Sequence, residues 1–234
     1  MSKKFFVLGL FIVAGFLFLN TNPVSAASKY WTGNGTSTDF WLLGNWDTAV
    51  PVSGDDIFLF ATSTKTAVVS TPVSLGAGKI YVGYNDKGNT AANSSGSFYL
   101  IVKEGASITN TGIFTVGTSS TVWLTSGSLS VGTTTIQQLA STTISSVTGA
   151  TSTVTIAGDF TLGAGALYTS PANSTTTINL PSGTSGTATF YATSTPTFGY
   201  LVFGGTGTTN LQNSVTVANR LSIAAGRTLA AGGG

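Results

Sequence analysis

The chain has no cysteine and no histidine, a single methionine, and only 7% charged residues among its 234. An average globular domain is about 25% charged, so this chain has less than a third of the usual proportion of acids and bases. Without cysteine and histidine it lacks the thiol nucleophile, the commonest general base and the usual ligands of zinc and copper. Disulfides are excluded too, so another interaction must hold the fold together.

The N-terminus has the three parts of a secretory signal peptide. Two lysines precede an apolar run from Phe5 to Leu19, and small residues follow up to Ala26 and Ala27. The run is short for a bilayer span, and Ala26 stands where the residue before a cleavage site is expected. We therefore predict that residues 1–26 are a signal peptide cleaved between Ala26 and Ala27, and not a retained membrane anchor.

The charge balance gives no reason to expect a nucleic-acid partner. The whole chain carries 9 basic and 7 acidic residues, and removal of residues 1–26 takes away two of the basic ones. A mature protein of near-zero net charge has no basic surface to attract nucleic acid or an anionic membrane. Contact with a membrane is expected only through the signal peptide during export.

The remaining sequence is typical of short β-strands. Threonine, valine and aromatic residues favour strands, apolar and polar residues alternate, and 30 glycines interrupt them. A motif of an apolar residue, a spacer, a second apolar residue and a small residue recurs, and its spacing predicts structural repeats of about 15–20 residues. Its copies begin at Ile80, Phe114, Leu129, Phe160, Leu201 and Leu221.

The distribution of charge favours a parallel β-solenoid over an antiparallel sandwich. No charged residue lies between Glu104 and Asp159, or between Asp159 and Arg220. A sandwich usually carries charges on its solvent face and edges, whereas the strands of a solenoid pair with their neighbours along the stack. We assign residues 63–234 to solenoid repeats.

A family resemblance is carried mainly by residues 30–60, which contain the motifs W-T-G, N-W and P-V-S-G-D-D. The later stretch from Val215 to Leu229 is similar to a repeat. Together they resemble bacterial autotransporter-like passenger domains and related exported β-strand-repeat proteins. The resemblance implies a right-handed parallel β-helix, secreted or displayed at the cell surface. The chain lacks the C-terminal barrel of autotransporters and a sorting motif, so we expect a fragment of a larger protein.

Residues 27–62 are predicted to form an N-terminal cap. Three of the four tryptophans, Trp31, Trp41 and Trp46, fall in this segment. A solenoid needs its first turn covered by something other than another turn, and large rings bury much apolar area. The alternative is that the three indoles form a platform on which a glycan stacks.

Four of the seven acids also fall in this segment, at Asp39, Asp47, Asp55 and Asp56. Their oxygens are the hard ligands that calcium prefers, which raises the possibility of a calcium site. The spacing matches neither an EF-hand nor a glycine-rich calcium repeat, and aspartate in turns ordinarily bonds the local backbone. We expect no other cofactor.

These features predict an exported, non-catalytic structural or adhesive protein, secreted or at the cell surface and associated there with the outer membrane. Its partners would be surface glycans, other surface proteins, or further copies bound end to end. A polysaccharide-binding or polysaccharide-degrading β-helix is the first alternative, although the central repeats supply few carboxylates for catalysis. The second is an ice-binding solenoid, for which runs such as Thr133–Thr135 and Thr175–Thr177 would have to form a flat array.

Overall fold

The computed structural model describes residues 26–60, 64–83, 97–118, 120–136, 141–145, 151–163, 165–179, 186–190, 196–211 and 213–231. The predicted signal peptide lies outside these ranges except for Ala26. Within them, no helix is long and apolar enough to cross a membrane.

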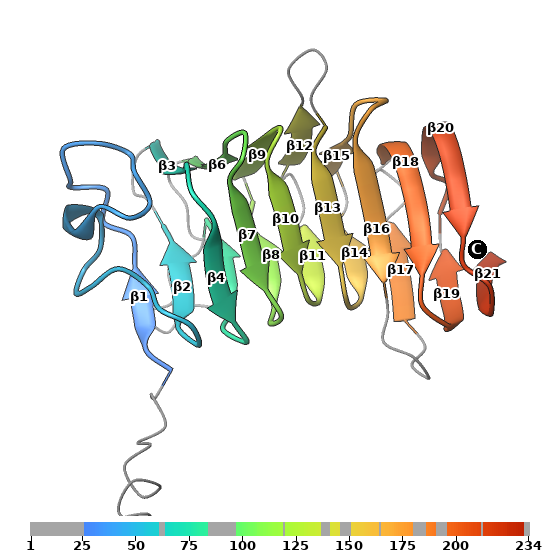
Figure 1. Ribbon diagram of the computed structural model, residues 1–234, viewed down its shortest axis with the longest axis horizontal. Coiled ribbons are helices and arrows are strands. Elements are labelled where there is room, and N and C mark those ends of the chain that lie inside the picture. The colour runs from blue at the N-terminus through green and yellow to red at the C-terminus, as the bar shows by residue number, and fades with distance from the viewer. Residues whose placement is uncertain are drawn as a thin grey trace, which may run out of the picture.

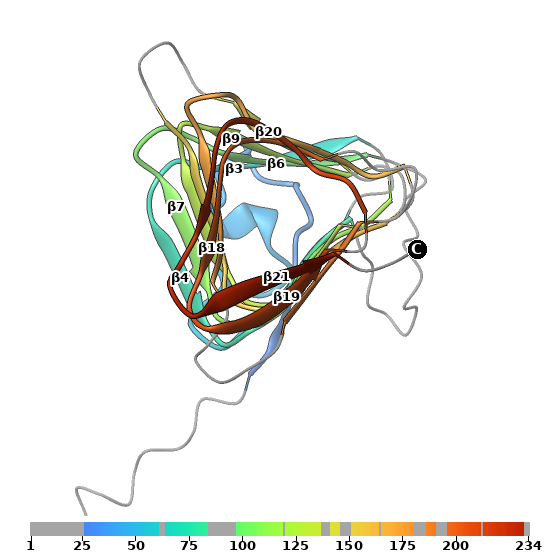
Figure 2. The ribbon, with the colours of Figure 1, turned by 90° about the vertical axis from the view of Figure 1, so that its right-hand side faces the viewer.

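Nearly all of the described chain is parallel β-sheet, which confirms the all-β prediction. Every pairing between named strands is parallel, and the helical content of this part of the chain is one 3-10 segment, η1 (Leu43–Asn45). The strands lie side by side along the long axis of the molecule (Figure 1), and viewed along that axis they give a three-sided outline (Figure 2). This arrangement is consistent with a β-solenoid.

The strands divide among three faces. Face 1 contains β3 (Lys65–Val69), β6 (Phe98–Val102), β9 (Thr121–Thr125), β12 (Ser141–Ser145) and β15 (Leu167–Thr169). Face 2 contains β4 (Val73–Gly76), β7 (Ser107–Asn110), β10 (Ser128–Val131), β13 (Thr153–Ile156) and β16 (Thr175–Asn179). Face 3 contains β1 (Ser28–Tyr30), β2 (Asp56–Leu59), β5 (Ile80–Val82), β8 (Phe114–Val116), β11 (Thr134–Ile136), β14 (Phe160–Leu162), β17 (Gly186–Phe190), β19 (Gly207–Leu211) and β21 (Arg227–Ala231). Two longer strands, β18 (Thr197–Gly204) and β20 (Thr216–Ile223), continue faces 1 and 2 together.

The strand register corrects the predicted repeat length. On face 3, Ile80 pairs with Phe114, Phe114 with Thr134, and Thr134 with Phe160, which gives turns of 34, 20 and 26 residues. These turns are longer than the predicted 15–20 residues. The reason is that copies of the short motif lie on two different faces, for example Phe114 on face 3 and Leu129 on face 2, so their spacing in sequence is not the length of a turn.

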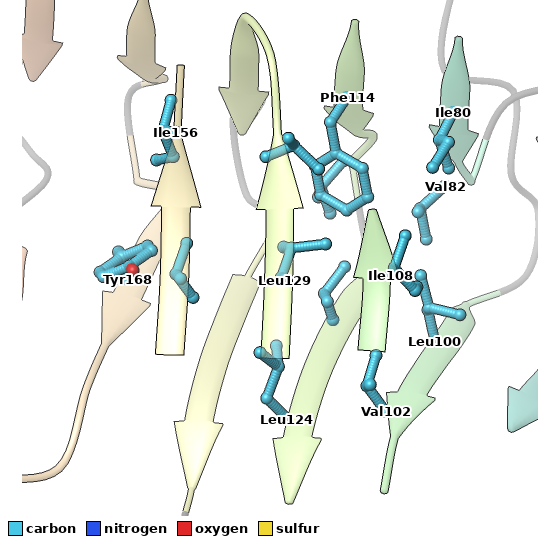
Figure 3. Packing of buried hydrophobic residues seen from close by; sticks show 14 of the residues in the cluster. Ile80, Val82, Leu100, Val102, Ile108, Phe114, Leu124, Leu129, Ile156 and Tyr168 are labelled. Atoms are coloured by element: carbon cyan, nitrogen blue, oxygen red, sulfur yellow. The ribbon is translucent and has the colours of Figure 1, made fainter. Parts of the chain in front are cut away.

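The alternation of apolar and polar residues places one set of side chains inside the stack. In β6, Phe98, Leu100 and Val102 are buried, while Tyr99 and Ile101 point outward and are partly exposed. Figure 3 shows Leu100, Val102, Ile108, Leu124 and Leu129 packed together between the sheets. Burial of such side chains removes about 25 cal/mol of unfavourable free energy per Å² of apolar surface. The core and the strand ladders thus replace the missing disulfides.

The last turn is less well covered than the others. Leu221 and Ile223 of β20 are each 46% exposed, whereas their register partners Leu201 and Phe203 in β18 are fully buried. The register gives them inner positions, and no further described turn packs on them. End-to-end association through this surface stays a prediction.

Candidate functional site

An aromatic cluster covers the first turn at the N-terminal end of the stack. Trp31, Phe40 and Trp46 are buried in the same core as Phe98. The Trp31 ring meets the Trp46 ring edge-on with 5.2 Å between centroids, and Trp46 meets Phe40 at 5.0 Å. The Trp46 indole Nε1–H also donates to the Phe40 carbonyl at 2.7 Å. This packing shields the apolar end of the stack from water. The predicted segment 27–62 also contains β2, which already pairs with β5.

The three predicted stacking residues do not share one exposed surface. Trp31 and Trp46 are buried in the cluster, and Trp41 is 37% exposed. The Trp41 Nε1–H donates to the Thr71 hydroxyl at 2.8 Å, which fixes the orientation of its ring. A glycan site at this end of the molecule stays a prediction that now concerns Trp41, because burial removes the other two rings from contact with a ligand.

Asn45 is the polar centre of the same segment, and sequence reasoning missed it. Its side chain is fully buried. The amide Nδ2 donates to the carbonyls of Ser37 and Asp39, each at 2.8 Å, and Oδ1 accepts from the Gly35 N–H at 2.9 Å. One asparagine therefore satisfies three backbone groups of the loop. Its position beside Trp46 in the motif G-N-W was the available signal.

Two of the predicted calcium ligands hold the turn that precedes β2. Asp55 is 1% exposed, and its two carboxylate oxygens accept from the N–H groups of Ala27 at 3.1 Å and Val52 at 3.0 Å. The neighbouring Asp56 Oδ1 accepts from the Lys79 N–H at 2.9 Å. Both carboxylates therefore bond the backbone of adjacent segments.

The other two predicted ligands also bond the backbone. Asp39 Oδ1 accepts from the Trp41 N–H at 2.9 Å, and Asp47 Oδ1 accepts from the Tyr30 N–H at 3.1 Å. Across the described ranges, no three Asp, Glu, His or Cys side chains are grouped so that they could hold a metal ion. Calcium binding stays a prediction without a ligand set.

The charged residues of the central turns lie apart. Lys103 and Glu104 are exposed in the turn after β6, between faces 1 and 2, and Asp159 is exposed just before β14, at the start of face 3. General acid and base groups must reach the same substrate atoms. The described residues of these turns do not bring such a pair together.

The core contains one buried phenol. Tyr168 of β15 and Thr176 of β16 are both buried, and their hydroxyl oxygens lie 2.6 Å apart in a hydrogen bond. Burial raises the pKa of Tyr168, and the bond to Thr176 opposes that rise only in part. The phenol is therefore neutral at physiological pH and serves as a hydrogen-bonding group inside the stack.

Face 2 carries a flat array of hydroxyl groups on its outer side, which we call the hydroxyl face. Two parallel files each cross β7, β10, β13 and β16. The first file is Ser107, Ser128, Thr153 and Thr175, and the second is Thr109, Ser130, Thr155 and Thr177. Neighbouring strands are about 4.8 Å apart and alternate residues in a strand about 6.7 Å apart. The eight side chains are uncharged and lie between buried residues, so they point outward.

Face 1 carries an outward stripe of apolar and aromatic side chains near the N-terminal end, which we call the aromatic stripe. Val68 pairs with Ile101, and Ile101 pairs with Trp123, which is 43% exposed. Tyr99 lies two residues before Ile101 on the same side of β6. Grouped exposed apolar residues mark surfaces that contact ligands or partners.

The chain matches no protein-family model, no curated protein and no solved structure. The functional assignment therefore depends on the residues and their geometry alone.

Proposed function

We propose that this chain is an exported, right-handed parallel β-helix with a non-catalytic structural or adhesive role, secreted or at the cell surface. The signal-peptide pattern of residues 1–26 and the resemblance of residues 30–60 to exported repeat proteins support export. The three-sided parallel stack supports the β-helix. Because its described interior is filled by packed side chains, contacts with partners would be made by the outer faces.

The hydroxyl face is the observation that carries this proposal. Each hydroxyl can donate and accept a hydrogen bond, so a file of them can contact polar surfaces of many kinds. A single contact of this type contributes little net free energy because water competes for it. Eight in fixed register, on a face without charge, add up in the manner of a multivalent contact.

Adhesion of the exported protein tests the proposal. The full chain is expressed in a secreting bacterium, located by fractionation, purified, labelled, and its binding to bacterial cells measured by flow cytometry. Ser130→Lys with Thr155→Lys places two bulky charges at the centre of the hydroxyl face and should lower binding by roughly tenfold. Thr135→Lys with Thr161→Lys makes the same change on neighbouring strands of face 3 and is the matched control. Retention in the cytoplasm, or equal loss in both variants, would contradict the proposal.

A polysaccharide ligand is the second candidate, and the aromatic stripe favours it. Trp123 and Tyr99 offer ring surfaces bordered by the hydroxyls of Thr121 and Thr66, a combination suited to the apolar faces and hydroxyl rim of a neutral sugar. Affinity electrophoresis in gels containing hydroxyethylcellulose, dextran or mannan tests it. Trp123→Thr should abolish retardation, and Tyr200→Ala, which removes an exposed aromatic ring on face 2, should leave it unchanged. Equal retardation of both variants would argue against this site.

Ice binding is the third candidate, because the two files of the hydroxyl face form the regular array that it requires. The irregular spacing of threonine in sequence disappears in the register, where loops of different length leave the paired positions aligned. Thermal hysteresis of the purified exported protein is the measurement. A freezing point depressed below the melting point, and restored by Ser130→Lys with Thr155→Lys, would favour this function over adhesion.

A further inference from the structure

The buried carboxylate of Asp55 lies next to the residue that signal cleavage would make the N-terminus. Asp55 Oδ1 accepts from the Ala27 N–H at 3.1 Å, and the carboxylate is 1% exposed. Two independent observations therefore point to Ala27. The sequence places the cleavage site before it, and the fold aims a buried acid at its nitrogen.

The surroundings hold this carboxylate in place. Its second oxygen accepts from the Val52 N–H at 3.0 Å, and the Asp55 N–H donates back to the Val52 carbonyl at 3.1 Å. The Asp55 carbonyl packs so closely on Gly78 that a side chain at Gly78 would overlap it. The carboxylate is therefore fixed in position before any N-terminus arrives.

The charges near this carboxylate leave it without a cationic partner among the described side chains. Its bonds run to two backbone N–H groups, while Lys29 Nζ bonds the Thr48 hydroxyl and Lys79 is exposed. Removing a carboxylate from water costs several kcal/mol unless an opposite charge and hydrogen bonds compensate. A positive group at the Ala27 nitrogen would supply the missing charge.

We propose that cleavage of the Ala26–Ala27 bond creates an α-ammonium group at Ala27 that forms a buried ion pair with Asp55. In this hydrolysis, water adds to the Ala26 carbonyl carbon and the C–N bond breaks. Ala26 leaves as a carboxylate, and the Ala27 nitrogen takes up the proton to become an ammonium. This group stays within hydrogen-bonding distance of Asp55 Oδ1 and turns a neutral hydrogen bond into a charge-assisted one.

The ion pair links processing to the stability of the first strand. The Ala27 carbonyl accepts from the Asp56 N–H at 2.9 Å, and Ser28 of β1 pairs with Asp56 of β2. Ala27 thus anchors β1 to the edge of face 3 beside the aromatic cluster. Ala26 is exposed, so the preceding chain has a path into solvent and the bond is accessible to a signal peptidase before docking. The inference depends on the export that the proposed function includes.

A cycle of exported variants tests the ion pair. The full chain is secreted by a bacterium, and mass spectrometry of the product is expected to show Ala27 as its first residue. A second chain carries Ala-Ser inserted between Ala26 and Ala27, so that its mature form keeps an amide at Ala27. The extension should lower the midpoint of thermal unfolding by roughly 3–8 °C. In the background of Asp55→Asn the two forms should melt within about 1 °C of each other.

Asp56→Asn is the matched control, because Asp56 is the neighbouring acid and bonds Lys79 instead. The extension should lower the midpoint of this variant as much as that of the unsubstituted chain. If Asp55→Asn fails to fold, labelling of the α-amine by an N-hydroxysuccinimide ester is measured on the unsubstituted product. Labelling at least tenfold slower in the folded than in the urea-unfolded protein supports the pair, and equal rates overturn it.

The outcomes separate this inference from the proposed function. A chain that stays in the cytoplasm contradicts export and the pair together. A product that is exported but begins at another residue, or one that begins at Ala27 and melts identically with and without the extension, overturns the pair and leaves the adhesive role intact.

Discussion

The phenol of Tyr168 and the hydroxyl of Thr176 form a hydrogen bond of 2.6 Å inside the apolar core, across the corner between face 1 and face 2. The register partners of Thr176 on both sides are Val154 and Leu201, which are apolar and buried. A polar pair is tolerated at this level of the stack because each hydroxyl satisfies the other.

Removing one partner of this pair should cost more than removing both. Tyr168→Phe leaves the Thr176 hydroxyl buried without this bond and should lower the free energy of unfolding by about 1–3 kcal/mol. Tyr168→Phe with Thr176→Val removes the unsatisfied group and should recover most of that loss. Urea unfolding followed by circular dichroism measures both. A loss in the double variant equal to the sum of the two single losses would show that the pair is not coupled.

The same phenol predicts a loss of stability at alkaline pH. Burial raises the pKa of Tyr168 above its ordinary value of about 10. Above pH 10 the unfolded chain releases this proton and the folded chain retains it, so the unfolded state is favoured as pH rises. The free energy of unfolding should fall by up to about 1.4 kcal/mol per pH unit in that range.

Two variants separate this effect from that of other tyrosines. Tyr168→Phe should flatten the alkaline decline, and Tyr200→Phe, at an exposed position, should leave it unchanged. Denaturant unfolding at several pH values between 8 and 11, an interval chosen to bracket the ordinary tyrosine pKa, is the measurement. An identical decline in all three proteins would assign the effect to other groups.

Replacement of Asn45 should loosen the N-terminal segment. Asn45→Ala leaves the carbonyls of Ser37 and Asp39 and the Gly35 N–H without this partner, at a cost of about 2–4 kcal/mol. Asn34→Ala, at an exposed position in the same loop, is the control. Hydrogen exchange read out by mass spectrometry should show faster exchange in residues 31–46 for the first variant only. Unchanged protection in this segment would contradict the role given to Asn45.

Close packing of the corner between faces 2 and 3 requires glycine at position 112. A Cβ added to Gly112 would overlap the carbonyls of Gly78 and Ala77 in the preceding turn. Because both are backbone atoms, they cannot move without disturbing the ladder, and Gly112→Ala should cost about 2–3 kcal/mol. Gly105→Ala adds backbone strain at a φ of 73° but meets no atom within 4 Å, and should cost roughly 1 kcal/mol. A larger loss at Gly105 would refute the packing argument.

Much of the strand structure could be predicted from the local pattern. The alternation in Thr153–Ile156 and the motif at Phe114 and Phe160 identify residues whose side chains are indeed directed inward in β13, β8 and β14. The repeat length could not be predicted in this way. Similar motifs occur on two faces, and sequence spacing alone does not say which copies are adjacent in space.

The candidate site shows the same division. The tryptophan-rich segment could be located by composition, but which indole is exposed depends on how the loop folds over the first turn. The files of the hydroxyl face could not be seen in sequence, because loops of unequal length separate Ser130 from Thr155 and Thr155 from Thr177. Only the hydrogen-bonded register brings these residues into line.

The sequence by itself determined that the chain is β-rich, poor in ionisable groups and without disulfides, because composition and two-residue alternation act locally on each strand. The tertiary structure alone decided which strands are neighbours, which hydroxyls form the two files, and that Asp55 is buried against Ala27. These are contacts between residues about 20–30 positions apart, and they are set by the closure of each turn on the one before it, which local pattern does not encode.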